Sequence, residues 1–420
     1  MKGGEILMTE QTISIKVKLQ LKDPTKQAEM HELMHAFRDG CNYVSQYIFD
    51  HNFKLNKNAI QKAIYHELRT IYRLKAQLAI SCIRSVVARY KTVQTQLQNN
   101  PLYVPSGKYD RKGKELWTPI QRDLNWLWYP IKFKRPQADL QRNRDWQLLK
   151  NGDISFATMT GRAKATPICK GFDQYFDGSW KAGVAKLLYI NNEWYLHIAM
   201  TKDIPQLQDN QVKNVVGLDR GLRFITNSYD SKNQSVFFNG KKAIAKRRHY
   251  KWLRSKLQSK HTKSAKRRLK KIGQRENRWM TDVNHRITKT LINHYGSHTL
   301  FVLEDLKGIR QTTEKVTKDK RYEQVSWAFY QFEQDLIYKA ALYNCKVLKV
   351  DAHYTSQRCP KCGQINKSNR NHDRHIYVCQ HCHYSSNDDR IGAMNIQNLG
   401  TWYLTGIEQP HYTKLDTSNT

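Results

Sequence analysis

Acidic side chains and long apolar runs are scarce in this 420-residue chain. Asp and Glu number 36 against 71 Lys and Arg, which gives a formal net charge of +35 at pH 7. A charge of this size indicates a polyanionic partner. No apolar run approaches the roughly 18–20 residues of a membrane-spanning helix, so we expect that partner to be a nucleic acid and not a membrane. No signal peptide is recognisable, and we expect a cytoplasmic bacterial protein that joins the nucleoid when it binds DNA.

Cysteine is also scarce, and half of the eight residues fall in one short segment. Cys359/Cys362 and Cys379/Cys382 form two Cys-x-x-Cys pairs with sixteen residues between them, the spacing of a four-thiolate zinc site. Four sulfur ligands leave no position open for water, so the Zn²⁺ is expected to be structural. Disulfides are the alternative, and nearby imidazoles are alternative ligands: His372, His375, His381 and His383. The scattered cysteines are expected to be buried thiols: Cys41, Cys82, Cys169 and Cys345.

The amino-terminal half predicts a small β-barrel with inserted helices. Apolar and polar residues alternate over 13–21, which is typical of a half-buried strand. Helical periodicity follows through 25–98. Two further alternating runs within 184–200 flank the turn Asn191-Asn192 and predict a hairpin.

Two stretches of this half carry no clear periodicity. Pro101–Asp123 contains several Pro and Gly residues and is expected to be a loop. Aromatic and basic residues interleave just after it, at Trp126, Trp128, Tyr129, Lys132, Phe133, Lys134 and Arg135. Such rings either stack on nucleobases or form barrel core, and both interpretations stay open. Residues 1–10 are expected to lie outside the fold, and one hypothesis is that translation begins at Met8.

Positive charge is concentrated in one stretch, 241–278, which has seventeen Lys or Arg residues and one acid, Glu276. A charged run is usually a solvated face. This one is so long and one-signed that we expect it to lie along a phosphate backbone, with an affinity that falls as salt rises. The cations expected to contact nucleic acid are Lys246, Arg247, Arg248, Lys251, Arg254, Lys263, Lys266, Arg267, Arg268, Lys270, Lys271, Arg275 and Arg278.

Three acids are candidate metal ligands. Asp219 follows an apolar strand predicted at 215–218, and Glu304 lies near the end of another at 299–306. Asp389 begins the helix predicted after the cysteine segment. Each acid alone is usually an exposed edge or cap residue. Three of them in a strongly basic chain predict two Mg²⁺ ions, for which carboxylate oxygens are the right ligands, and the phosphodiester hydrolysis of an RNase H-like nuclease.

Four motifs carry a resemblance to a known family. They are GLDRG (217–221), LEDLKGI (303–309), TSQRCPKCG (355–363) and NDDRIGAMNI (387–396). They resemble the three RuvC motifs and the zinc ribbon of TnpB, the transposon-encoded RNA-guided nucleases related to compact type V CRISPR effectors. Over 11–200 only the layout is similar.

The resemblance implies a Mg²⁺-dependent, RNA-guided DNA endonuclease. Asp219, Glu304 and Asp389 would be the catalytic acids and would hold two Mg²⁺ ions. The guide RNA would derive from the transposon end, and the single RuvC site would cut double-stranded DNA that matches the guide and carries a short flanking motif. The protein would act as a monomer in a ribonucleoprotein.

The implied fold is an α/β multidomain one: an RNase H-like RuvC nuclease domain with an inserted zinc ribbon, preceded by a β-barrel wedge domain with an inserted α-helical recognition bundle. The boundaries would be the wedge at 11–24 and 99–210, the recognition bundle at 25–98, the nuclease at 211–354 and 387–404, the target-nucleic-acid-binding ribbon at 355–386, and a disordered tail at 405–420.

Two departures from the family pattern concern the third acid. This chain has Ile391 at the Asn position of the usual Asp-x-Asn-Ala-Ala, so the hydrogen bond that Asn could make near the acids is expected to be unmade, which leaves the efficiency of cleavage open. The doublet Asp388-Asp389 leaves the register open, and placing Asn395 on the family's terminal Asn selects Asp389.

A guide-dependent DNA-binding repressor or transposition accessory protein, with weak or no cleavage, is the alternative function. All three acid types are retained, which favours the nuclease. Mg²⁺-dependent nicking of a matched target would distinguish the two. A DNA-strand transferase is favoured less, because the polar linker at 307–322 offers no further catalytic group.

Overall fold

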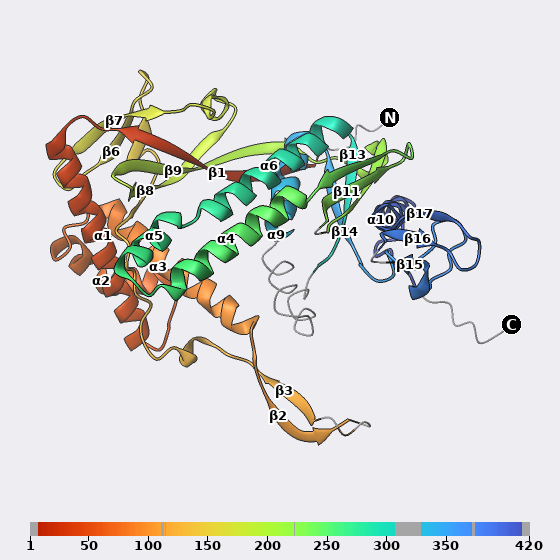
Figure 1. Cartoon of the computed structure of the whole chain (residues 1–420). Coiled ribbons are helices and arrows are strands. Elements are labelled where there is room, and N and C mark those ends of the chain that lie inside the picture. The colour runs from red at the N-terminus through yellow and green to blue at the C-terminus, as the bar shows by residue number, and fades with distance from the viewer. Residues whose placement is uncertain are drawn as a thin grey trace. The chain divides into compact units, whose positions relative to one another are not determined.

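The structure, a computed structural model, describes residues 7–110, 113, 115–221, 223–306, 329–371 and 374–413. It has two compact units: an amino-terminal unit (Thr12–Lys202) and a carboxy-terminal unit (Asp203–Thr420 with the residues up to Gln11) (Figure 1). The predicted linker at 307–322 and His372 lie outside the described residues. Among the helices of the described ranges, none is long and apolar enough to cross a membrane.

A seven-stranded sheet of order β4-β8-β9-β1-β7-β6-β5 forms the amino-terminal unit's barrel. Its strands are β1 (Met8–Gln20), β4 (Ala138–Leu140), β5 (Trp146–Leu148), β6 (Ile154–Ala157), β7 (Arg162–Ile168), β8 (Lys181–Ile190) and β9 (Glu193–Pro205). The edge strands β4 and β5 follow each other closely in the chain, and the Trp146 indole N–H donates to the carbonyl of Gly183 in β8 (3.1 Å). The two edges therefore approach each other, and the predicted barrel is nearly closed.

The predicted hairpin at 184–200 is confirmed as β8 and β9. Asn191 and Asn192 between them both have positive φ (53° and 63°), the backbone that a two-residue hairpin turn requires and that Asn tolerates. The start of the barrel differs from expectation, because β1 begins at Met8 and not after residue 10.

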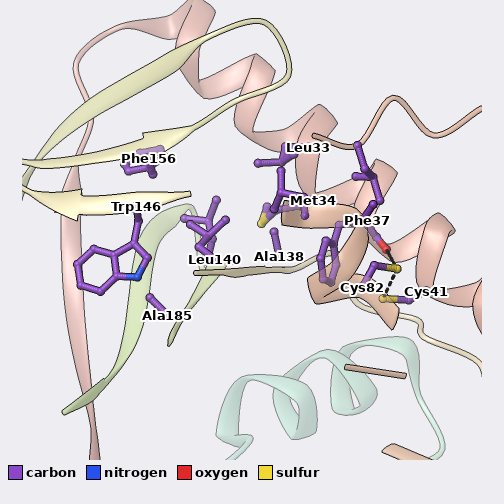
Figure 2. Close-up of a cluster of buried hydrophobic side chains, with 14 of the residues drawn as sticks. Leu33, Met34, Phe37, Cys41, Cys82, Ala138, Leu140, Trp146, Phe156 and Ala185 are labelled. Atoms are coloured by element: carbon purple, nitrogen blue, oxygen red, sulfur yellow. Dashed lines mark hydrogen bonds between the residues drawn. The ribbon is translucent and has the colours of Figure 1, made fainter. Parts of the chain in front are cut away.

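Three helices lie between β1 and β4 in the chain, as predicted: α1 (Pro24–Asp50), α2 (Lys57–Thr70) and α3 (Ala76–Gln98). Asp23 caps α1 by accepting from two backbone N–H groups, and Pro24 suits the first turn. Figure 2 shows the core between helix and barrel, in which Leu33, Met34 and Phe37 lie near Ala138 and Leu140.

The scattered cysteines follow expectation with one exception. Cys41, Cys82 and Cys345 are buried thiols, whereas Cys169 is half-buried. The sulfurs of Cys41 and Cys82 lie 3.4 Å apart, inside the core of Figure 2.

The segment expected to be a loop is a two-stranded hairpin, so that expectation is wrong. β2 (Leu102–Tyr109) and β3 (Glu115–Ile120) pair with each other and, within the described chain, with no third strand. Pro105 lies opposite Trp117 in this ladder. Proline is tolerated because both strands of an isolated ribbon are edge strands, each with one side free of ladder hydrogen bonds. The ribbon projects beyond α3 (Figure 1).

The carboxy-terminal unit is built on a five-stranded sheet of order β12-β11-β10-β13-β14. Its strands are β10 (Asn214–Asp219), β11 (Phe224–Asp230), β12 (Ser235–Asn239), β13 (Thr299–Glu304) and β14 (Lys346–Val350). β10, β13 and β14 are parallel, and β11 joins β10 in antiparallel fashion. The strands predicted at 215–218 and 299–306 are thus confirmed as neighbours, and their continuous apolar runs suit a sheet that is covered on both faces.

Helices cover both faces of this sheet. On one face, Val216 lies in a core with residues of α6 (Arg275–Tyr295) and α9 (Phe329–Leu342). On the other, Val215 lies in a core with residues of α10 (Asp388–Leu404). The acids at the strand ends are held by this two-sided cover.

The basic stretch is helical, as expected, and comprises α4 (Lys241–Ser259), α5 (Lys263–Ile272) and the start of α6. Thr262 caps α5 through its hydroxyl, and Gly273 ends it with a positive φ of 46°. Leu257 and Leu269 belong to the small apolar core of this helical pair.

The cysteine segment contains a three-stranded sheet and leads into α10. Its strands are β15 (Arg370–Asn371), β16 (Ile376–Val378) and β17 (Ser385–Asn387). The described residues also form the single-turn 3₁₀ helices η1 (Leu124–Trp126), η2 (Asp173–Tyr175), η3 (Asp209–Gln211) and η5 (Lys367–Asn369).

The tail expected to be disordered is in part ordered. Tyr412 is buried against the α10 face of the sheet, and its hydroxyl donates to the carbonyl of Asn395 (2.8 Å). Residues 414–420 lie outside the described residues. The tail prediction failed because one aromatic side chain found a place in a core formed by distant segments.

Candidate functional site

Two of the predicted acids end neighbouring parallel strands. Asp219 is the last residue of β10 and Glu304 the last of β13, and Leu218 pairs with Leu303 just before them. This register brings the two acids to the same sheet edge. Carboxyl ends of parallel strands are where open α/β sheets bind ligands.

The third predicted acid, Asp389, reaches the same edge because α10 packs closely on β10. Two glycines permit the approach. A Cβ on Gly217 in the strand would collide with the α10 backbone at Ala393, and a Cβ on Gly392 would come within 2.9 Å of the Asp219 carboxylate. Asp389 lies in the first turn of α10, one turn before Gly392, and its negative charge acts on Asp219.

Electrostatics link the three carboxylates. Burial, followed by the charges of Glu304 and Asp389, holds the pKa of Asp219 well above its ordinary value. Burial also raises the pKa of Glu304, against an opposing hydrogen bond from Thr355. Burial and the charge of Asp388 raise the pKa of Asp389. Negative charge is therefore unfavourable at this edge unless a cation compensates it.

Glu304 is held by two residues that the sequence interpretation did not assign. The buried Thr355 hydroxyl donates to Glu304 Oε1 (2.6 Å), and the Arg220 guanidinium donates to the Glu304 carbonyl (2.5 Å). Arg220 also pairs with Glu333 of α9 (3.6 Å). Both residues lie within the motifs that carry the resemblance, so a reading of motif neighbours as supports would have found them.

Arg370 of β15 brings a cation to the acids, and no sequence signal pointed to it. Its guanidinium lies 3.0 Å from Asp388 and 3.6 Å from Asp389. Its charge lowers the pKa of both Asp219 and Glu304, against the larger effect of burial. The cysteine segment thus contributes directly to the electrostatics of the acid site.

The doublet is divided between two environments. Asp388 is almost fully buried and accepts from Arg370, with His375 Nδ1 at 3.6 Å. Asp389 acts on Asp219, and its Oδ2 is buried without a hydrogen-bond partner among the described residues. An unsatisfied carboxylate oxygen beside two other acids fits a divalent cation.

The acid oxygens do not form one tight cluster. Among the described residues, the oxygen- and nitrogen-bearing group whose ligand atoms all lie within 4.8 Å of one another is His375, Asp388 and Asp389. Asp219 and Glu304 share their edge with Asp389 and lie outside that group. Asp389 therefore belongs to both sets.

The four predicted zinc ligands come together. Their sulfurs all lie within 4.8 Å of one another, with Cys359 to Cys382 at 3.6 Å and Cys362 to Cys379 at 3.5 Å. These separations are far longer than a disulfide and close to the ~3.8 Å edge of a tetrahedron with zinc–sulfur bonds of ~2.3 Å. His375 lies with the aspartates and not with the sulfurs. The residues fit a four-sulfur zinc site.

The predicted nucleic-acid contacts differ in exposure. Ten of the thirteen cations are exposed: Lys246, Arg248, Lys263, Lys266, Arg267, Arg268, Lys270, Lys271, Arg275 and Arg278. Arg247 is buried, and Lys251 and Arg254 are half-buried. Arg254 pairs with the buried Glu276 at 2.5 Å, which ties α4 to α6.

Comparison with known families matches both halves of the site. Residues 329–396 match the Cas12f1-like TNB domain, and residues 197–322 match OrfB_IS605, described as a probable transposase. These ranges hold the three acids and the four cysteines. The chain carries OrfB_IS605-like and Cas12f1-like TNB domains.

Several TnpB and Cas12f1-like relatives align with large parts of the chain. The CRISPR-associated endodeoxyribonuclease Cas12f1 of Sulfoacidibacillus thermotolerans is 25% identical over 359 residues, 79% of each chain. The TnpB-like protein L79 of Acanthamoeba polyphaga mimivirus is 27% identical over 212 residues, 47% of this chain and 40% of the relative. The putative RNA-guided DNA endonuclease InsQ of Escherichia coli K12 is 25% identical over 248 residues, 55% and 60% respectively. The last two alignments span less than two thirds of those relatives.

Solved structures are similar in fold. A Cas12f1–sgRNA–target DNA complex has a TM-score of 0.53 and covers 93% of this chain and 99% of its own. The mini-RNA-guided endonuclease CRISPR-Cas_phi3 has a TM-score of 0.54 and covers 96% and 94%. Both are 10% identical to this chain, so the likeness concerns the fold alone.

The departure of this chain from the Asn position of the Asp-x-Asn-Ala-Ala pattern has a structural reason. Ile391 is fully buried in a small core with Cys359, Tyr377 and Cys379. An amide there would enter an apolar contact between α10 and the cysteine segment. The hydrogen bonds that hold α10 against the cysteine segment come from Asn395, which donates to the carbonyls of Thr355 (2.7 Å) and of Arg358 (2.8 Å).

Proposed function

We propose that the chain is an RNA-guided DNA endonuclease that cuts guide-matched double-stranded DNA with a single site formed by Asp219, Glu304 and Asp389. The observation that carries the proposal is their convergence at one sheet edge from three distant segments. The relatives named as a CRISPR-associated endodeoxyribonuclease and as a putative RNA-guided DNA endonuclease support the same reading.

The three acids are the proposed ligands of two Mg²⁺ ions. Divalent ions held there would activate a water and stabilise the leaving 3′ oxygen of the phosphodiester. Thr355 orients Glu304 through one carboxylate oxygen and leaves the other for a ligand. Arg370 is placed to pair with a phosphate once a cation occupies Asp389, because the cation and the guanidinium would compete for that carboxylate.

The cysteine segment is the proposed zinc ribbon, inserted in the nuclease domain. With Zn²⁺ bound, the ribbon would hold Arg370 and the first turn of α10 in place, since Asn395 and Ile391 connect the helix to it. The proposed domain boundaries are those that the resemblance implies, with the wedge barrel and recognition bundle before residue 211.

The exposed cations of α4 to α6 are the proposed binding surface for the nucleic-acid backbone. Ten exposed Lys and Arg residues on neighbouring helices suit a phosphate chain. We assign guide RNA and target DNA as the partners on the basis of this charge and of the family.

Readout of the flanking motif is proposed for a cavity of about 450 Å³ in the amino-terminal unit. Three glutamines and three arginines of its lining are Gln61, Gln77, Gln141, Arg84, Arg142 and Arg144. Gln and Arg pair bidentately with adenine and guanine edges in the major groove. Arg144 donates to Gln77 at 3.0 Å, which orients both. Selection from targets with randomised flanks should show relaxed preference for Gln77→Ala, and an unchanged preference would contradict this assignment.

Cleavage of a matched plasmid by the protein with its co-purified RNA tests the central proposal. Double-strand cutting should require Mg²⁺ and a guide match, and chelation should stop it. Binding without nicking, at any divalent concentration, would favour the guide-dependent repressor or accessory protein instead.

A further inference from the structure

The β2–β3 ribbon leaves both faces of its sheet uncovered. Two strands alone are marginally stable at best in water, because neither face is packed. Antiparallel pairing places Tyr103, Tyr109 and Trp117 on one face, and each of these rings is 54% to 65% exposed. Leu102, Leu116 and Ile120 lie on the other face and are exposed as well. Exposed apolar surface of this extent marks a binding site.

A second group of rings follows the ribbon in the chain. Trp128 and Tyr129 are 87% and 81% exposed, and Trp126 of η1 is 43% exposed. The structure thus removes the barrel-core interpretation for these three rings, whereas Phe133 is half-buried and packs against the core of the amino-terminal unit. The Arg122 guanidinium donates to the Asn100 carbonyl at the base of the ribbon (2.8 Å), which fixes where the two strands leave the helices.

The charge around these rings favours a nucleic acid over a protein as the occupant. Lys108, Lys132, Lys134 and Arg135 are exposed and lie near the rings in the sequence. Residues 99–136 contain eight Lys or Arg and three acids. Flat rings interleaved with cations are the composition that binds unpaired bases and their phosphates, whereas protein interfaces are depleted in lysine.

The marginal stability of the ribbon distinguishes RNA from DNA. Target DNA is unpaired only while it is being opened, so it would leave the ribbon uncovered for most of the protein's life. A guide RNA stays bound before and after the target is met. An uncovered ribbon needs a partner of that kind, which can cover its faces permanently.

We propose that the aromatic face of the ribbon and the exposed rings of Trp128 and Tyr129 are two stacking sites for unpaired bases of the bound RNA. The inference rests on the proposed function only in that the RNA is the guide. Stacking on aromatic rings is how proteins take up unpaired RNA bases, and it tolerates many sequences because every base has a flat face.

Cross-linking with RNA that contains 4-thiouridine tests the site directly. The reconstituted complex is irradiated and digested with trypsin, which releases the peptides 115–122 and 123–132. We expect cross-linked uridine on Trp117 in the first peptide and on Trp128 or Tyr129 in the second. Cross-links that fall elsewhere and spare both peptides would overturn the proposal.

Affinity measurements separate stacking from other roles. The double variant Tyr103→Leu/Trp117→Leu keeps apolar strand residues and removes the rings, and about a tenfold loss of RNA affinity or more is expected. The fold-loss of RNA affinity relative to the unchanged protein should be the same at about 0.1 M and about 0.4 M salt, because no phosphate contact is removed. Tyr103→Phe/Trp117→Tyr keeps two flat rings and should restore binding.

The matched control is Leu102→Ala/Leu116→Ala on the opposite face, which should change RNA affinity less than about twofold. An equal loss in this control, or a loss of protein self-association in the ring variant with RNA affinity intact, would refute the stacking site. RNA binding is measured without any cleavage. A protein that cross-links RNA at the ribbon and cuts no DNA would keep this inference and end the nuclease proposal. A protein that cuts DNA and forms no cross-link at the ribbon would keep the nuclease proposal and end this inference.

Discussion

The acid-bearing sheet and the β2–β3 ribbon use the same kind of strand under opposite conditions. In the sheet, β10 and β13 have helices on both faces, and α10 approaches so closely that Gly217 and Gly392 admit no Cβ without a shift. In the ribbon, both faces are exposed to solvent. Cover on two sides fixes the positions of charged groups, and the absence of cover leaves a surface that a partner must complete.

This difference explains where each kind of chemistry can reside. Three carboxylates with raised pKa values persist only where packing holds them together, because their mutual repulsion would otherwise separate them. Exposed rings need no such frame, since a base supplies the missing contact.

The largest effect is expected from Asp219→Ala or Glu304→Ala. Each removes a proposed metal ligand and no guide contact, so cleavage should fall about a thousandfold or more while RNA-guided binding is kept. Plasmid cutting and a gel-shift assay with the same complex measure the two. The control is Asp282→Ala, an exposed acid of α6. Wild-type cutting by either variant would remove the acids from the active site.

Cys379→Ser should release the zinc and disconnect the cysteine segment from the acids. Structural zinc contributes about 10–16 kcal/mol to the folding of small sites. The apolar core of the cysteine segment has only a few residues and so depends on the metal. We expect zinc content, measured by mass spectrometry of the metal, to fall from about one per chain to none, with cleavage reduced more than about a hundredfold. Cys169→Ser, at a half-buried cysteine away from the sulfur cluster, should keep both zinc and activity. A zinc-free Cys379 variant with full activity would contradict the assignment.

Thr355→Val should weaken cleavage about tenfold, because Glu304 loses the hydrogen bond that orients it. Thr355→Ser keeps the hydroxyl and should retain most of the activity. Single-turnover cleavage at saturating Mg²⁺ is the suitable measurement. Equal rates for the valine and serine variants would show that the hydroxyl has no positioning role.

The smallest effect is expected when the same change, Leu to Ala, is made once in each of the two regions. Leu300→Ala in the covered sheet should lower the free energy of unfolding by about 2–5 kcal/mol, because Leu300 is fully buried. Leu116→Ala in the ribbon should change it by less than about 0.5 kcal/mol in RNA-free protein, because Leu116 is exposed. Urea unfolding followed by circular dichroism measures both. Similar losses would mean that the ribbon is covered within the chain after all.

Much of the acid site could be predicted from the sequence. Apolar runs that end in Asp219 and Glu304 indicated buried strands, and parallel strands bring their carboxyl ends to one edge. The cysteine spacing likewise brought four sulfurs together, because a Cys-x-x-Cys turn acts over a few residues. The two strands and the closeness of the four sulfurs could be predicted because each depends on local periodicity or local spacing.

The β2–β3 ribbon and the residues that contact the acids could not be predicted in this way. Pro and Gly in 101–123 indicated a loop, because composition does not reveal that two irregular strands will find each other. Arg370 meets Asp388 only because the strands β15, β16 and β17 of the cysteine segment pair in one particular register. Tyr412 was assigned to a tail because its core contacts come from residues far away in the chain.

By itself, the sequence determined the charge that selects a nucleic-acid partner, the spacing that selects zinc, and the strands on which two of the acids lie. Only the tertiary structure decided that Arg370 meets Asp388, which cations remain on the surface, and that the rings at 126–129 face solvent. The physical reason is range: composition, periodicity and spacing act along the chain. Burial and side-chain pairing, in contrast, depend on which distant segments pack against one another.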